Sequence, residues 1–95
     1  MRILLVEDEK MLSGFIVKGL RNAGYAVDPV YDGEEALYEY EVNEYDLIVL
    51  YLNLPKKDGL EVLREIRAKY QEIKVLILSA RTKVGVKILF FYCFV

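Results

Sequence analysis

The sequence contains no histidine, no tryptophan, one cysteine and two prolines among its 95 residues. With Cys93 alone, the chain has neither a disulfide framework nor the ligand spacing of a zinc site, and a reducing cytoplasm is the expected setting. A run of Lys and Arg is also absent, and the net charge is −2. Because nucleic-acid binding depends on clustered cations, we expect no nucleic-acid surface on this segment.

Long apolar segments are absent too. The longest, residues 88–95, has eight residues, whereas a transmembrane helix needs about 20. The N-terminus leads directly into a short strand and an acidic loop, so we expect no secretion signal and no membrane contact. With 55% apolar and 29% charged residues, the chain is typical of one small folded domain.

Strand and helix patterns alternate along the first 80 residues. Strands are predicted at 3–6, 25–30, 46–51 and 74–79. Helices are predicted at 10–22, 34–42 and 60–70. This alternation predicts an α/β fold with a parallel sheet.

The first predicted helix has an apolar stripe. Its inward positions are expected to be Leu12, Phe15, Ile16 and Leu20, and Gly24 provides a left-handed stop after it.

Composition changes after Thr82. Between Thr82 and the terminus only Lys83 and Lys87 carry charge. A parallel crossover needs about a dozen residues, whereas residues 81–87 supply seven. We therefore expect residues 84–95 to form an atypical tail, not a fifth parallel strand. A hairpin edge, a swapped segment and a disordered end all stay open for this tail.

Two neighbouring predicted strands end in chemically different residues. The first leads into Glu7 and Asp8, whereas the strand at 46–51 ends at Tyr51. Ligands of an open parallel sheet bind beyond the carboxyl ends of its strands, so this edge is the candidate site. The acidic pair suits a hard cation such as Mg²⁺. It also suits a structural role beside the positive end of the following helix.

Three motifs in this order, LLVEDE, VLYLNLPKKDG and VLILSA, resemble the receiver domain of bacterial two-component response regulators, especially receivers that precede a winged-helix DNA-binding domain. The resemblance covers residues 1–83, a partial receiver domain that the tail at 84–95 follows. It implies a flavodoxin-like, doubly wound parallel sheet with strand order 2-1-3-4. The fifth strand and the last helices of that fold are missing or replaced by the tail.

The resemblance also implies site residues. Glu7 and Asp8 match the acidic pair that holds Mg²⁺, and Asn53 matches the position whose backbone carbonyl is a further ligand. Ser79 matches the hydroxyl residue that contacts the phosphoryl group. Tyr51 stands where the family has its phosphate-accepting aspartate, and the family's Lys-Pro pair after strand 5 has no match.

The resemblance further implies a signalling domain of a phosphorelay, not an enzyme, with a sensor histidine kinase as partner. An ordinary phenol, with a pKa of about 10, stays protonated at pH 7, whereas a carboxylate is ionised. We therefore expect that Tyr51 prevents phosphorylation in the family manner and weakens Mg²⁺ binding, while removing one of several mutually repelling charges.

Two other interpretations stay open. In the first, the chain is a non-signalling interaction or dimerisation module that self-associates through the apolar tail. In the second, it is a truncated or frameshifted product without selected function.

Local structural roles are expected for Asp46 and Asp58, and packing roles for Tyr38, Tyr40 and Tyr45.

Overall fold

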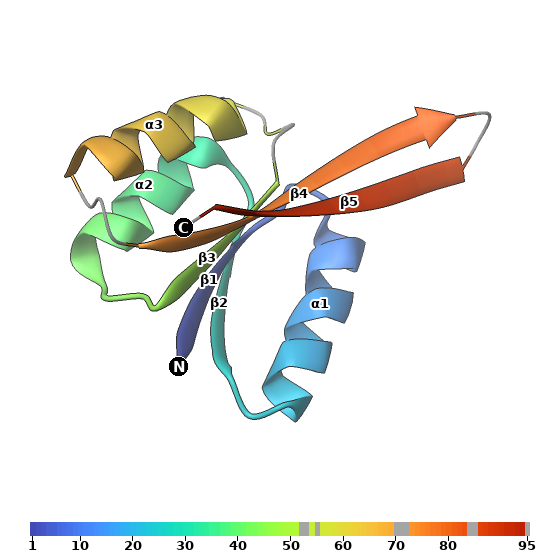
Figure 1. Cartoon of the computed structure of the whole chain (residues 1–95). Helices are drawn as coiled ribbons and strands as arrows, with labels where there is room; N and C mark the ends of the chain where they lie inside the picture. The colour runs from blue at the N-terminus through green and yellow to red at the C-terminus, as the bar shows by residue number, and fades with distance from the viewer. Residues whose placement is uncertain (52–53, 55, 70–72, 84–85, 95) are drawn as a thin grey trace.

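The computed structural model describes residues 1–51, 54, 56–69, 73–83 and 86–94, with side chains as far as residue 78. Strands and helices alternate along the chain until a terminal hairpin (Figure 1). The elements are β1 (Arg2–Val6), α1 (Lys10–Asn22), β2 (Ala26–Val30), α2 (Gly33–Val42), β3 (Leu47–Tyr51), α3 (Gly59–Lys69), β4 (Lys74–Lys83) and β5 (Val86–Phe94). No helix within these ranges is long and apolar enough to cross a lipid bilayer.

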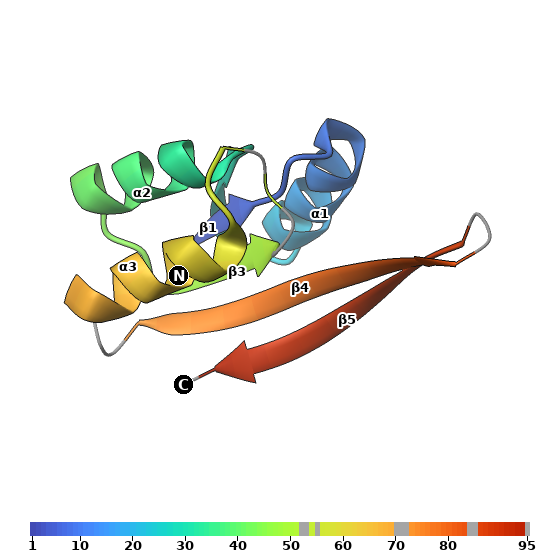
Figure 2. The same cartoon turned by 90° about the horizontal axis from the view of Figure 1, so that it is seen from above.

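The strands form one sheet in the order β2-β1-β3-β4-β5. The first four are parallel to one another, which confirms the predicted α/β class and the order 2-1-3-4. Helix α1 covers one face of the sheet, whereas α2 and α3 lie together on the other (Figures 1 and 2). Because β1 and β3 are parallel neighbours, their carboxyl ends lie side by side at one end of the sheet. This end of the strands is the carboxyl edge.

The tail adopts the first of its three predicted arrangements, a hairpin edge. Strand β5 pairs antiparallel with β4, from Val75 opposite Phe94 to Lys83 opposite Val86. Strand β5 also pairs with residues 80–83, and β4 therefore runs four residues beyond its predicted end at Ser79. The short connection after β4 explains the direction of β5, since only an antiparallel neighbour can be reached without a long crossover.

Side chains of the central strands alternate between two cores. On the α2 and α3 side, the buried residues include Leu4, Val6, Ile48, Leu50, Ala36, Val62 and Ile66. On the α1 side, they include Ile3, Leu5, Val17, Val27, Val49, Tyr51 and Leu78. This division follows from the two-residue period of a strand, in which successive side chains point to opposite faces.

The predicted inward position of Phe15 is wrong, because its side chain is 78% exposed. The stripe of α1 that faces the sheet is centred on Ser13, Ile16, Val17 and Leu20. Phe15 lies two residues after Ser13, which is about 200° around a helix of 3.6 residues per turn. Because the buried Ser13 is polar, the apolar pattern of the sequence does not show which face of α1 points inward.

A network of polar side chains joins β1, β2 and the residues just before β3, at the end of the sheet opposite the candidate site. Arg2 donates to Asp28 Oδ2 from Nε at 2.9 Å and from Nη2 at 2.6 Å, and Tyr45 Oη donates to the same oxygen at 2.8 Å. Burial raises the pKa of Asp28, but hydrogen bonds from Tyr45 and Arg2 outweigh it and hold that pKa below its usual value.

Residues around this network have the local roles that the sequence predicts, with one exception. Asp46 Oδ2 accepts a hydrogen bond from the Arg2 backbone N at 2.7 Å. The Tyr40 ring stacks on Tyr45, with 6.2 Å between the ring centroids. Tyr38 is 63% exposed, so its predicted packing role is wrong.

The connection between β3 and α3 is held against the start of α2. A Cβ atom on Gly33 would lie 2.3 Å from the Lys57 carbonyl oxygen and 2.9 Å from Val62 Cγ2, so only glycine fits there. Lys56, whose φ is +63°, contacts Asp32 at 3.5 Å between Nζ and Oδ2. These contacts position the segment that follows the candidate site.

Gly33→Ala is expected to lower the free energy of unfolding by about 1–3 kcal/mol, because the new methyl group overpacks against backbone. Gly14→Ala is the matched control, since a Cβ there meets nothing within 4 Å. That change should raise stability by about 0.5–1 kcal/mol, the usual gain from Gly to Ala within a helix. Urea denaturation followed by circular dichroism measures both, and equal effects would contradict the close approach at Gly33.

The network at Asp28 predicts a loss of stability in acid. A carboxyl group with a lowered folded-state pKa stabilises the fold above its unfolded pKa of about 3.9, and this contribution disappears as the pH falls through the folded value. Urea midpoints between pH 7 and pH 2.5 should therefore fall more for the unmodified chain than for Asp28→Asn. Parallel acid profiles for the two proteins would show that Asp28 does not contribute.

Candidate functional site

The carboxyl edge of β1 and β3 brings together the two chemically different strand ends. Val6 pairs with Leu50, so Glu7 and Tyr51 take the next position on each strand. Tyr51 lies on the same side of the sheet as Leu5 and Val49, which is the side covered by α1. Strand alternation, continued one residue past Val6, places Glu7 on that side as well. The structure therefore juxtaposes the predicted metal-binding acid and the residue at the acceptor position.

The acidic pair Glu7 and Asp8 is divided between interior and surface. Glu7 is 0% exposed, whereas Asp8 is exposed. Glu7 Oε1 accepts a hydrogen bond from Glu9 N at 3.1 Å, and Glu7 N donates to Val30 O at 3.1 Å. Glu7 thus holds the turn that leads into α1.

The side chain of Tyr51 is part of the core on the α1 side. It is 6% exposed and belongs to the same buried cluster as Leu5, Val49 and Leu78. A tyrosine buries on the order of 150–250 Å², which favours keeping this ring inside. At this corner of the site, the structure therefore has a packed aromatic ring in place of a solvent-facing acid.

Two further predicted site residues are not tested by side-chain geometry. Asn53 lies outside the described residues, so its backbone contact to a metal stays a prediction. Ser79 follows Leu78, the register partner of Tyr51, so its backbone lies at the same edge of the sheet. The phosphoryl contact of Ser79 also stays a prediction.

Strand β5 cannot bring a basic residue to this edge from its carboxyl end. Phe94 pairs with Val75 near the start of β4, so β5 ends at the amino edge of the sheet. Lys87 pairs with Thr82, three positions beyond Ser79. Because β5 runs antiparallel to β4, its carboxyl end lies at the end of the sheet opposite Glu7 and Tyr51.

Charged residues of the β3–α3 connection have local partners. Lys57 Nζ contacts Glu65 Oε2 at 2.9 Å, and this hydrogen bond raises the pKa of Lys57. Asp58 Oδ1 accepts from Leu60 N at 2.9 Å, so its predicted local role at the start of α3 is confirmed.

The described residues do not fit a tightly held Mg²⁺ ion. Within the ranges that the structure covers, no group of three or more His, Cys, Asp and Glu side chains is placed to hold a metal. Mg²⁺ requires an octahedron of oxygen ligands, several of them water. Glu7 is 0% exposed, and β3 ends in the buried phenol of Tyr51, which adds no carboxylate.

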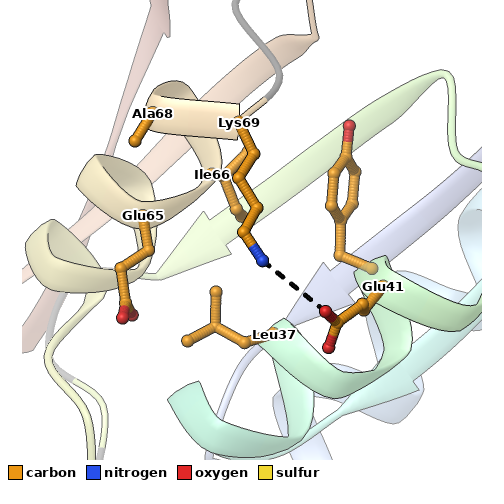
Figure 3. A pocket seen from close by; sticks show the side chains of 7 residues that line it. Leu37, Glu41, Glu65, Ile66, Ala68 and Lys69 are labelled. Atoms are coloured by element: carbon orange, nitrogen blue, oxygen red, sulfur yellow. Dashed lines mark ion pairs between the residues drawn. The ribbon is translucent and has the colours of Figure 1, made fainter.

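A separate groove lies between α2 and α3, with a volume of about 330 Å³. Figure 3 shows Leu37 and Ile66 within it, and Lys69 of α3 reaching toward Glu41 of α2, at 3.5 Å between Nζ and Oε1. Its lining consists of helix-packing and surface side chains. We assign no chemistry to it.

Residues 3–90 match the family model of the response regulator receiver domain, and the chain belongs to this family. The resemblance seen in the sequence motifs is thereby confirmed.

Among curated proteins, the chain is similar to the transcriptional regulatory protein QseB of Haemophilus influenzae. The two are 46% identical over 81 residues, covering 85% of this chain and 37% of QseB. The two-component response regulator PhoP of Pseudomonas aeruginosa is 42% identical over 81 residues, covering 85% of this chain and 36% of PhoP. The chain thus spans less than two fifths of these relatives.

Among solved structures, the chain is similar to the response regulator TrrA of Thermotoga maritima in complex with Mg²⁺-BeF. The TM-score is 0.81 at 38% identity, covering 85% of this chain and 70% of that one. A complex of TrrA with the histidine kinase ThkA matches with a TM-score of 0.80 at 36% identity, covering 90% of this chain and 73% of that one. Both comparisons support the receiver fold.

Proposed function

We propose that this chain is a receiver domain of a two-component system whose phosphoryl-accepting centre is disabled by Tyr51. The observation that carries the proposal is the burial of Tyr51 in the core beside the position of Glu7. In this proposal residues 1–83 are the receiver part and residues 84–95 an added tail, a boundary supported by the change to an antiparallel strand.

Three physical differences separate Tyr51 from an acceptor aspartate. Tyr51 has a phenol in place of the carboxylate that is the nucleophile of an acceptor aspartate. Its oxygen lies farther from the backbone than a carboxylate oxygen does, at the end of a ring that packs in the core. The third carboxylate is absent, so Mg²⁺ binding at Glu7, Asp8 and the Asn53 carbonyl is weak. Ser79 then has no phosphoryl group to contact.

We also propose a sensor histidine kinase as partner and a cytoplasmic location. The relative TrrA, solved in complex with the kinase ThkA, supports the partner class. Exposed Met11 and Phe15 lie one turn apart on α1, just after Asp8, and exposed apolar patches favour a protein partner. In this account a kinase docks without transferring its phosphoryl group.

A non-signalling interaction module is the second candidate. Strand β5 at the edge of the sheet favours it, since an unpaired edge is a template for pairing with another chain. A truncated product without selected function predicts neither kinase docking nor defined self-association.

Phosphorylation from a small donor tests the first proposal. After incubation with Mg²⁺ and acetyl phosphate, intact mass spectrometry should show no phosphoryl adduct on the unmodified chain, because it lacks the nucleophile. Tyr51→Asp should gain one adduct that hydroxylamine removes, as expected for an acyl phosphate. Tyr51→Asn is the matched control, with similar size and no carboxylate.

Two outcomes would count against this account. An adduct on the unmodified chain would show that another group accepts phosphate. Failure of Tyr51→Asp to label, with its far-UV spectrum unchanged, would show that Tyr51 is not what disables the centre.

A further inference from the structure

The outer edge of β5 is long and unprotected. The strand has nine residues, VKILFFYCF, with no proline and with Lys87 as its single charge. Natural sheets usually protect an edge by shortness, proline, several charges or a covering element. In both views no other described element lies along the outer side of β5 (Figures 1 and 2).

The opposite edge of the sheet, formed by β2, is closed. Ala26 N donates to Met1 O and Val30 O accepts from Glu7 N, so the even-numbered residues of β2 turn their backbone groups toward β1. Pro29 then falls on the outward side, where it has no N–H to offer. The outward carbonyl of Val27 already accepts a hydrogen bond from Arg21 Nη2 at 2.9 Å.

We propose that two copies of this chain pair through β5, antiparallel and about a two-fold axis, so that two five-stranded sheets become one. Identical strands related by a two-fold axis are self-complementary, and their backbones supply the hydrogen bonds that each edge lacks. Because β2 cannot extend the sheet, assembly stops at two copies. This surface is separate from the carboxyl edge at Glu7 and Tyr51, so the inference does not depend on the phosphorylation proposal.

Repulsion between the two copies of Lys87 favours the antiparallel pair over the parallel pair. With full overlap of residues 86–94, Phe90 lies opposite Phe90 of the partner subunit, and Lys87 lies opposite Cys93 of the partner subunit. In a parallel pair with the same overlap, Lys87 would face Lys87 of the partner subunit, which is unfavourable for like charges. The antiparallel pair places the two lysines at opposite ends of the interface.

Sedimentation equilibrium of the unmodified chain under reducing conditions tests the stoichiometry without any substitution. The chain should approach twice its monomer mass as its concentration rises. A monomer at every concentration would overturn the proposal. Assemblies that grow beyond two copies would overturn it as well, because they would show that a second surface of the chain also associates.

Disulfide formation tests the register. The double variant Phe90→Cys and Cys93→Ser should form a cross-linked dimer on mild oxidation, because opposite Cα atoms are about 4.5–5.5 Å apart in an antiparallel pair. The native Cys93 is the matched control. Its two copies would be six positions apart along the strands, about 20 Å, so it should not cross-link. Cross-linking through Cys93 in place of residue 90 would overturn the antiparallel register.

Discussion

The parallel pairing of β1 with β3 holds the two cores and the candidate site together. These two strands carry the largest share of the fully buried side chains, including Leu4, Leu5, Ile48 and Leu50. Buried residues of α1, α2 and α3 belong to the two cores on either side of them. The same pairing brings Glu7 and Tyr51 to adjacent positions at the carboxyl edge. A substitution at that edge therefore alters the core and the site together, because both are made by consecutive residues of the same two strands.

At this edge, the Tyr51 ring is part of the core. An acceptor carboxylate must stay ionised and reach solvent, whereas the Tyr51 ring lies in the α1-side core with Leu5 and Leu78. The tyrosine adds buried apolar surface and removes a negative charge beside an acidic residue, and both effects stabilise the folded chain without a metal. Active sites are commonly less stable than a site filled for packing alone. In the proposed function, this chain keeps the scaffold of a receiver in its more stable form and loses the receiver's chemistry.

The sequence predicts the first four strands and three helices within a few residues, since continuous apolar runs and helical periodicity are strong local signals. The strand order comes from the family resemblance. Burial of Glu7 escapes prediction, because an acidic residue at a strand end has the same pattern whether it faces solvent or caps a turn. The phase of α1 is obscured by Ser13, a polar residue on the inward stripe. The hairpin of β4 and β5 stays one of three alternatives, since residue patterns indicate a strand more clearly than the neighbour with which it pairs.

In the proposed function, the packed ring of Tyr51 stands where related receivers have a metal-binding, phosphate-accepting acid. Thermal unfolding of the unmodified chain and of Tyr51→Asp, each with Mg²⁺ and with NaCl at the same ionic strength, tests this proposal. Without Mg²⁺ the variant should unfold at the lower temperature, because it loses the buried ring and places a charge beside Glu7. Mg²⁺ should then raise the unfolding temperature of the variant alone, since a ligand that binds only the folded state adds about 2.7 kcal/mol at 100 times its Kd. Equal stabilisation of both proteins by Mg²⁺ would contradict the account.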